Sequence, residues 1–230
     1  MLDCGFSISE TKRRLARMDM MPSDLSGIIV THEHSDHAGG VIPLARRHKI
    51  PVWMSYGTYL AYEGNCEDID IRFCRDGDRV VINDLQLTAF TVPHDAREPL
   101  QFHITNGRYK LGVLTDIGQV TAHMIHALSA CDLLVLECNH DLQMLANSTY
   151  PQVLKKRISG GLGHLSNKDA AGFLAMLDQS KLKKVVGAHL SQQNNRPDLV
   201  KQTLYSAMNL SSTEVVIADQ EKGFEWIETE

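Results

Sequence analysis

A dense run of residues able to bind metal constrains this chain more than any other feature. Within six positions the chain carries His32, His34, Asp36 and His37. The run lies between an apolar segment, residues 27–30, and a helix that we expect to begin near Ala38. In an extended segment residues two apart face the same side, so His32 and His34 can bind one ion together. The turn into the helix redirects Asp36 and His37, which can then reach a second ion.

The types of ligand restrict the metal without naming it. Neutral imidazoles combined with carboxylates suit zinc, and also manganese or iron. A single histidine or aspartate after a strand is usually a solvated loop residue. Polar groups crowded at a strand end serve no packing purpose, so we interpret this cluster as a metal site.

The pattern H-x-H-x-D-H after an apolar strand resembles the signature of the metallo-β-lactamase-fold hydrolases. The resemblance implies an α/β protein of the αβ/βα sandwich type, with two mixed β-sheets flanked by helices. In that family up to two metal ions are bound at one edge of the sandwich, by five short motifs spread along the chain.

Three later segments resemble the remaining ligand motifs of the family: Pro93-His94-Asp95, Leu114-Thr115-Asp116 and His189-Leu190-Ser191. The resemblance implies that His94 completes a first metal site with His32 and His34. It further implies a second site of Asp36, His37 and His189, and it makes Asp116 the bridge between the two ions. For Asp116 the alternative is an aspartate that merely caps a turn.

The first residues, Met1 to Gly5, look like the end of a strand. In the resembled family this D-x-G element follows an opening hairpin, so we expect one or more N-terminal strands to be missing from this sequence. The resemblance gives Asp3 the role of steadying the metal loop. The alternative is a plain turn aspartate before Gly5.

His164 is a candidate catalytic residue outside the ligand set. Ser166 and Asp169 predict a capping box for the next helix, which places His164 just before a helix N-terminus, where anions are favoured. The pair G-H-L-S and A-H-L-S is similar to the closing motifs of nucleic-acid-processing members such as the tRNA 3′-end nucleases, in which the earlier histidine assists phosphodiester cleavage. The alternative for His164 is a structural role at the cap.

A longer pattern points to one branch of the family. The runs L-E-C-N-H-D-L-x-M-L, G-H-L-S-N and H-L-S-Q-x-N-N resemble the YycJ/WalJ-like branch, which is associated with 5′-to-3′ exonuclease activity on DNA. The implied catalyst is a hydroxide that bridges two divalent ions, most simply zinc, with Asp36 and His164 as catalytic residues.

Composition and net charge limit the kinds of partner that this chain can bind. A net charge of −5 gives no global attraction to nucleic acid, so we expect substrate binding at a local basic run, Lys155, Lys156 and Arg157. No apolar run approaches the length of about 20 residues that a membrane span needs. The five cysteines follow no metal or disulfide spacing. We therefore expect a cytoplasmic protein without membrane contact and leave its oligomeric state open.

The pattern of apolar residues predicts one domain, residues 1–230, because no linker-like segment divides the chain. We expect helices over 9–18 and 197–208 and a hairpin through Asn106-Gly107. Buried strands are expected over 27–31, 133–136 and 185–188, and the last strands over 213–218 and 223–227.

Three functions are compatible with the sequence. A phosphodiesterase, in particular a nuclease, is favoured by the two H-L-S motifs. A hydrolase of small esters, thioesters or lactams is the alternative, since the same hydroxide attacks carbonyls. A non-catalytic metal-binding regulatory module would need a defective ligand set, whereas all seven ligands that the resemblance implies are present.

Overall fold

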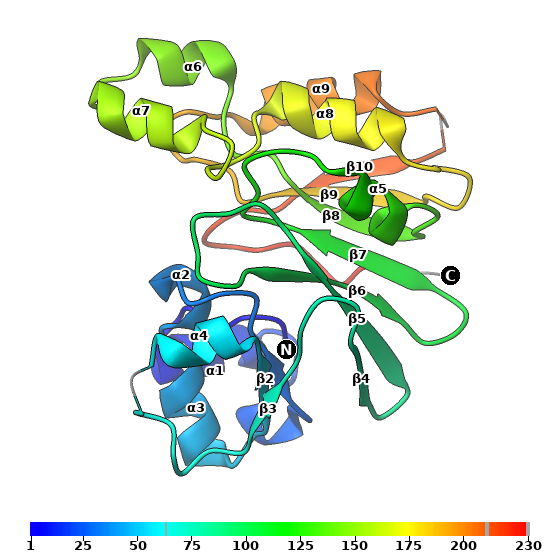
Figure 1. The fold of residues 1–230 in the computed structure, drawn as a ribbon. Helices are drawn as coiled ribbons and strands as arrows, with labels where there is room; N and C mark the ends of the chain where they lie inside the picture. The colour runs from blue at the N-terminus through cyan, green and yellow to red at the C-terminus, as the bar shows by residue number, and fades with distance from the viewer. Residues whose placement is uncertain (63, 210–211, 229–230) are drawn as a thin grey trace. The chain divides into compact units, whose positions relative to one another are not determined.

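The computed structural model describes residues 1–62, 64–209 and 212–228. The chain divides into two compact units: an N-terminal unit, Met1–Thr91 with Ala96–Phe102, and a C-terminal unit, Val92–Asp95 with His103–Glu230. Among the described residues the strands form two sheets, of three and seven strands, and helices accompany them in both units (Figure 1). The expectation of a single domain stays a prediction.

The N-terminal unit holds the first nine helices and strands and a single 3-10 turn. Its helices are α1 (Ile8–Ala16), η1 (Pro22–Asp24), α2 (Ser35–Ala38), α3 (Val41–His48) and α4 (Tyr56–Leu60). Its strands are β1 (Ile28–Ile29), β2 (Val52–Met54), β3 (Ile71–Phe73), β4 (Arg79–Ile82) and β5 (Leu85–Thr91). Strands β1, β2 and β3 are parallel neighbours, with Ile28 opposite Val52 and Val52 opposite Ile71. Strands β4 and β5 form an antiparallel hairpin.

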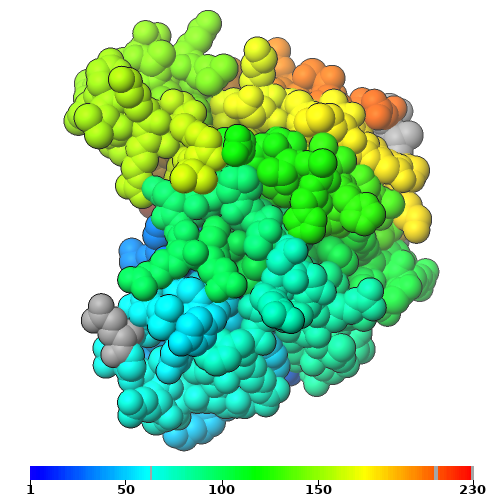
Figure 2. Space-filling view, viewed as in Figure 1, coloured from blue at the N-terminus to red at the C-terminus, as the bar shows by residue number. Residues whose placement is uncertain are grey.

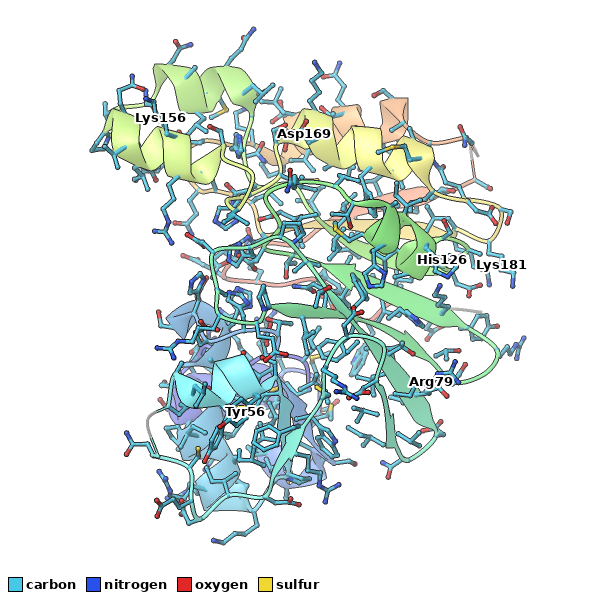
Figure 3. All side chains as sticks on the ribbon, viewed as in Figure 1. Tyr56, Arg79, His126, Lys156, Asp169 and Lys181 are labelled. Carbon is cyan, nitrogen blue, oxygen red and sulfur yellow. The ribbon has the colours of Figure 1, made fainter. Side chains whose placement is uncertain are left out.

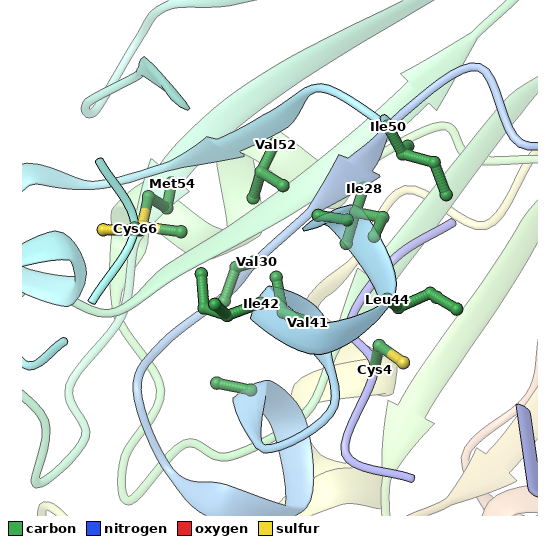
Figure 4. Close-up of a cluster of buried hydrophobic side chains, with 12 residues drawn as sticks. Cys4, Ile28, Val30, Val41, Ile42, Leu44, Ile50, Val52, Met54 and Cys66 are labelled. Carbon is green, nitrogen blue, oxygen red and sulfur yellow. The ribbon is translucent and has the colours of Figure 1, made fainter. Parts of the chain in front are cut away.

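A hydrophobic core fixes the two elements that flank the metal-binding run (Figure 4). Helix α3 is amphipathic and buries Val41 and Leu44, while its last turn is basic. These side chains share one cluster with Ile28 of β1 and Val52 of β2. The segment between β1 and α3 therefore starts and ends on anchored backbone.

The C-terminal unit is built on a parallel ladder. Its strands are β7 (Lys110–Leu114), β8 (Leu133–Glu137), β9 (Lys184–Ala188) and β10 (Glu214–Ile217), paired in that order. Strand β6 (Leu100–Thr105) begins in the N-terminal unit and ends in this one. The helices are α5 (Ala122–Leu128), α6 (Leu142–Asn147), α7 (Gln152–Ile158), α8 (Asn167–Met176) and α9 (Pro197–Ser206). Because the strands are parallel, their carboxyl ends meet at one edge of the sheet.

One predicted strand is wrong. Residues 223–227 do not form a strand, and the pairing stops after a single bridge between Asp219 and Gly223. The side chain of Asp219 accepts hydrogen bonds from the backbone of Glu221 and Lys222, which closes a tight turn. The segment also lacks a buried face that would hold a strand, since Phe224 is 45% exposed and Trp226 is 66% exposed.

Two other expectations need adjustment. The helix expected near Ala38 is split into α2 and α3, with Gly39 and Gly40 between them. The short helices α4, α5, α6 and α7 had no prediction, because segments of five to seven residues carry little helical periodicity. None of the helices described here is long and apolar enough to cross a membrane.

Candidate metal and catalytic site

Three imidazoles converge at the end of β1 in the N-terminal unit. The ring of His32 is buried, and its centroid lies 4.6 Å from that of His34 and 4.3 Å from that of His37. Asp36, in the first turn of α2, is exposed, and its Oδ2 lies 3.6 Å from Nε2 of His37. The four residues of the run therefore form one local cluster, which we call the metal loop.

Asp3 holds the metal loop through three hydrogen bonds. Its Oδ1 accepts from the backbone N–H of Thr31 at 2.8 Å, and its Oδ2 accepts from the Thr31 hydroxyl and from Nδ1 of His37, both at 2.8 Å. With its proton on Nδ1, His37 carries its lone pair on Nε2, the nitrogen that could bind a metal. Asp3 thus sets both the orientation and the tautomer of His37.

Thr31 extends the same arrangement to a second histidine. Its Oγ1 lies 3.0 Å from Nδ1 of His32 and, because its proton goes to Asp3, it accepts the proton of that nitrogen. His32 is thereby left with its Nε2 as the metal-binding atom. Sequence reasoning missed Thr31. The only available signal was a hydroxyl residue directly before the first histidine of the run.

Close backbone packing locks the N-terminal segment against the metal loop. The backbone N–H of Cys4 donates to the carbonyl of His37, and the N–H of Gly40 donates to the carbonyl of Cys4, both at 2.7 Å. A Cβ atom at Gly5 would lie 1.8 Å from the carbonyl oxygen of Asp36. Only glycine allows this approach, so the D-x-G pattern has a local steric cause.

In the C-terminal unit, the edge of the parallel ladder carries the second cluster. Asp116 follows β7, Glu137 ends β8 and His189 follows β9. Asp116 and His189 both adopt left-handed backbone, with φ of 54° and 57°. Left-handed backbone is uncommon outside glycine, although aspartate and histidine adopt it more readily than most other residues.

Glu137 is the centre of this second cluster. The side chain is fully buried, and its Oε1 accepts from Nδ1 of His164 at 2.8 Å and from Nδ1 of His189 at 2.9 Å. Its Oε2 accepts the backbone N–H groups of Ile117 and Leu165. Burial alone would raise the pKa of Glu137, but the hydrogen bonds from the two histidines outweigh it and lower the pKa, so the carboxylate is ionised.

His189 and His164 differ in what they can do, although one oxygen of Glu137 holds both. Nε2 of His189 lies 3.6 Å from Oδ1 of Asp116, which suits two ligands of one ion. Burial favours a lower pKa for His164, but its hydrogen bond to Glu137 and the charges of Glu137 and Asp116 raise it. Together Asp116, Glu137, His164 and His189 bring possible ligand atoms within 4.8 Å of one another.

His94 joins the same cluster from the loop after β5. Its buried ring donates from Nδ1 to the carbonyl of Gly163 at 3.2 Å, so Nε2 is the ring nitrogen with a lone pair. That Nε2 lies 3.8 Å from Oδ1 of Asp116. The two predicted ligands His94 and Asp116 therefore lie side by side.

The helix cap beside His164 differs in one detail from the prediction. The Oγ of Ser166 accepts the backbone N–H of Asp169, as expected of an N-cap. The carboxylate of Asp169, however, accepts from the Ser166 hydroxyl at 2.6 Å instead of from the backbone N–H of Ser166. The cap is present without the reciprocal half of a capping box.

The basic run lies on α7, and two of its three members have structural partners. Lys155 donates to the carbonyl of Ala146 at 2.6 Å, and Arg157 donates to Oδ2 of Asp95 at 2.8 Å. Lys156 is exposed on the same helix (Figure 3). The three side chains therefore do not form one uniform cationic face.

The donor set of each unit fits divalent metal ions. Histidines whose Nδ1 is fixed by a carboxylate, a hydroxyl or a carbonyl offer oriented, neutral Nε2 atoms, which is the usual arrangement around zinc. His32, His37, His94 and His189 all have this form. Asp36 and Asp116 add carboxylate oxygens.

Comparison with known proteins identifies the family. Residues 1–189 match the family described as "Beta-lactamase superfamily domain". Exodeoxyribonuclease YycJ of Bacillus anthracis is 34% identical over 227 residues, which cover 97% of this chain and 82% of that protein. Exodeoxyribonuclease WalJ of Streptococcus pneumoniae serotype 2 (strain D39) is 32% identical over 213 residues, which cover 90% and 79%.

A solved structure supports the fold independently. The metallo-β-lactamase fold protein YhfI from Bacillus subtilis superposes with a TM-score of 0.73 at 17% identity, over 98% of this chain and 86% of that one. The predicted α/β fold class is confirmed. The chain belongs to the beta-lactamase superfamily, has the metallo-β-lactamase fold and is a metal-dependent hydrolase.

Proposed function

We propose that this protein is a phosphodiesterase that degrades DNA from the 5′ end, with two divalent ions, preferably zinc. The observation that carries the proposal is the position of His164, which shares the oxygen of Glu137 with His189. One histidine of this pair is suited to a metal, and its neighbour to a phosphate group. The two relatives described as exodeoxyribonucleases support the choice of substrate.

The proposed ligand set draws on both units. His32, His34 and His94 would hold the first ion, Asp36, His37 and His189 the second, and Asp116 would bridge them. The support is that each unit by itself presents oriented Nε2 atoms next to carboxylate oxygens. This assignment requires the two units to act as one domain.

The residues of the chain then have distinct tasks. Bound ions supply an activated water at neutral pH and neutralise charge on the phosphoryl group in the transition state. Asp36 would orient that water and accept its proton, and its exposed carboxylate beside His37 supports this role. His164 binds a phosphate oxygen and gives a proton to the leaving oxygen, and Glu137 keeps its ring in place.

A cytoplasmic location is part of the proposal. All five cysteines are buried thiols outside any disulfide, which fits a reducing compartment. Burial raises the pKa of the Cys131 thiol to about 11, so at neutral pH this thiol stays protonated and unreactive.

The test combines metal analysis with a substrate screen. We expect close to two metal equivalents per chain and release of label from 5′-labelled DNA before label from 3′-labelled DNA. Bis-p-nitrophenyl phosphate should be hydrolysed, whereas p-nitrophenyl acetate should not be hydrolysed faster after metal addition. Metal-dependent cleavage of the carbonyl ester without cleavage of DNA or RNA would overturn the proposal in favour of a small-molecule hydrolase.

A further inference from the structure

Three aromatic rings form an exposed group on the N-terminal unit, which we call the aromatic platform: Tyr56, Tyr59 and Phe73. The centroids of Tyr56 and Tyr59 lie 6.0 Å apart in a stacked arrangement. Phe73 meets Tyr56 and Tyr59 edge-on, at 5.4 and 5.2 Å. Tyr56 is 55% exposed and Phe73 is 53% exposed, so a large apolar area faces solvent.

The platform is rigidly supported. Tyr59 packs against the hydrophobic core of the unit, and the rings of Tyr56 and Phe73 contact it from outside. At the start of α4 the buried hydroxyl of Ser55 accepts the N–H of Thr58 and donates to the carbonyl of Glu98. The rings are therefore held in place before any partner binds.

Two hydrogen bonds connect the platform with the metal loop. The side chain of Glu33, between His32 and His34, accepts the backbone N–H of Arg97 at 2.8 Å. The side chain of the next residue, Glu98, accepts the backbone N–H of Gly57, beside Tyr56, at 2.7 Å. The segment 97–98 thus spans from the metal loop to the first turn of α4.

A cationic side chain lies on this connecting segment. Arg97 is exposed, and among the described residues its guanidinium has no ion-pair partner. The backbone of Arg97 therefore lies between the metal loop and the first turn of α4. The cyan atoms of the α4 region lie on the face seen in Figure 2, and Figure 3 marks Tyr56 on that helix.

We propose that the aromatic platform stacks an unpaired base of the nucleic-acid strand whose phosphates are held by Arg97 and the metal loop. The inference rests on the proposed function and specifies its substrate as a single strand or a frayed end. Aromatic rings beside a cation are how proteins bind single strands without sequence preference, because every base has a stacking face.

A scattered exposed ring would not carry this inference, since single apolar side chains on a surface are normal. Tyr205 of α9 is such a case, 46% exposed and without an aromatic neighbour among the described residues. Its exposure is close to that of Tyr56. The variant Tyr205→Ala is therefore a matched control.

The first measurement is binding of a fluorescein-labelled, nuclease-resistant phosphorothioate oligo-dT to the metal-loaded protein, followed by anisotropy. We expect Tyr56→Ala and Phe73→Ala each to weaken binding about ten-fold, and Tyr56→Trp to retain it, since stacking on one ring contributes about that much. Tyr205→Ala should bind like wild type. On a strand of the same length made of abasic sites, Tyr56→Ala should bind no more weakly than wild type.

The second measurement is the ratio of DNA cleavage to bis-p-nitrophenyl phosphate hydrolysis, which should fall about ten-fold in Tyr56→Ala. An unchanged ratio in an enzyme that does cleave DNA would overturn this inference alone. Wild-type protein that neither binds nor cleaves any strand would overturn the proposed function as well. A platform that instead joins two copies of the chain would appear as a dimer that Tyr56→Ala dissociates without affecting strand binding, and this too would overturn the inference.

Discussion

Each of the two units orients its histidines with a carboxylate, Asp3 in one and Glu137 in the other. In the N-terminal unit Asp3 orients His37 directly and His32 through Thr31. In the C-terminal unit Glu137 orients both His164 and His189 directly. The side chain of Asp3 retains 17% exposure, whereas that of Glu137 has none.

This difference determines how much each carboxylate controls. Water can replace part of the contacts of Asp3, because its oxygens are partly accessible. A buried carboxylate has no such substitute, so all the partners of Glu137 must come from the protein. The two backbone N–H groups on its Oε2 complete this shell. Glu137 should therefore be the more sensitive of the two positions, and it holds both the proposed metal ligand His189 and the proposed catalytic residue His164.

The largest effect is expected for Glu137→Gln. The amide keeps the shape but loses the charge, and when its oxygen faces the two imidazoles its NH2 group faces the backbone N–H donors of Ile117 and Leu165. We expect DNA cleavage to fall by about 10³-fold or more, because metal binding and proton transfer are both impaired. Inductively coupled plasma mass spectrometry should show reduced metal content after dialysis.

The control for this variant is Glu214→Gln, an exposed glutamate of the same unit paired with Lys184. It should leave cleavage and metal content at wild-type levels. Wild-type metal content and cleavage in Glu137→Gln would show that the charge of the buried carboxylate does not control the two histidines. The proposed difference between Glu137 and Asp3 would then be wrong.

The contrast between the units also shows what the sequence could and could not predict. The metal loop is contiguous, so its four residues were identified from spacing alone. Glu137 was noticed only as one of several polar residues at a strand end. Its role could not be predicted because its partners lie 20 to 52 residues away in the chain, and the parallel register of β7, β8 and β9 brings them together. His94, Asp116 and His189 were found through the family pattern, which encodes that register.

The errors in secondary structure have a related cause. Buried parallel strands such as β8 and β9 were predicted well, because their apolar runs reflect burial on both faces. The strand expected over 223–227 is wrong because a local sequence pattern does not supply a pairing partner, and only the bridge between Asp219 and Gly223 forms. Short helices such as α7 depend on tertiary contacts, including the bond from Lys155 to Ala146, which a local pattern does not contain.

A smaller effect, of another kind, is expected for His164→Ala. Removing this ring leaves Glu137 bonded to His189 and should not remove a metal ligand. We expect turnover of DNA to fall about 10²-fold with metal content unchanged, since general acid catalysis contributes at least that much. His126→Ala, on the exposed face of α5 (Figure 3), is the control and should behave as wild type. Loss of metal from His164→Ala would make His164 a ligand instead.

The smallest effect is expected for Asp3→Asn, which separates the two carboxylates most sharply. Asp3 has a φ of 54°, a conformation that asparagine tolerates, so the backbone should remain intact. The amide oxygen can still accept from both the Thr31 hydroxyl and His37, but the backbone N–H of Thr31 then loses its acceptor, which partial exposure lets water replace. We expect metal affinity to fall about ten-fold, at the lower end of the range for residues that support metal ligands, and added zinc should restore the lost activity.

Asp19→Asn is the matched control, because Asp19 has the same φ of 54° but is exposed and lies outside the site. An Asp3→Asn variant as impaired as Glu137→Gln, and not rescued by zinc, would show that burial does not distinguish the two carboxylates and that both units depend equally on their anchors.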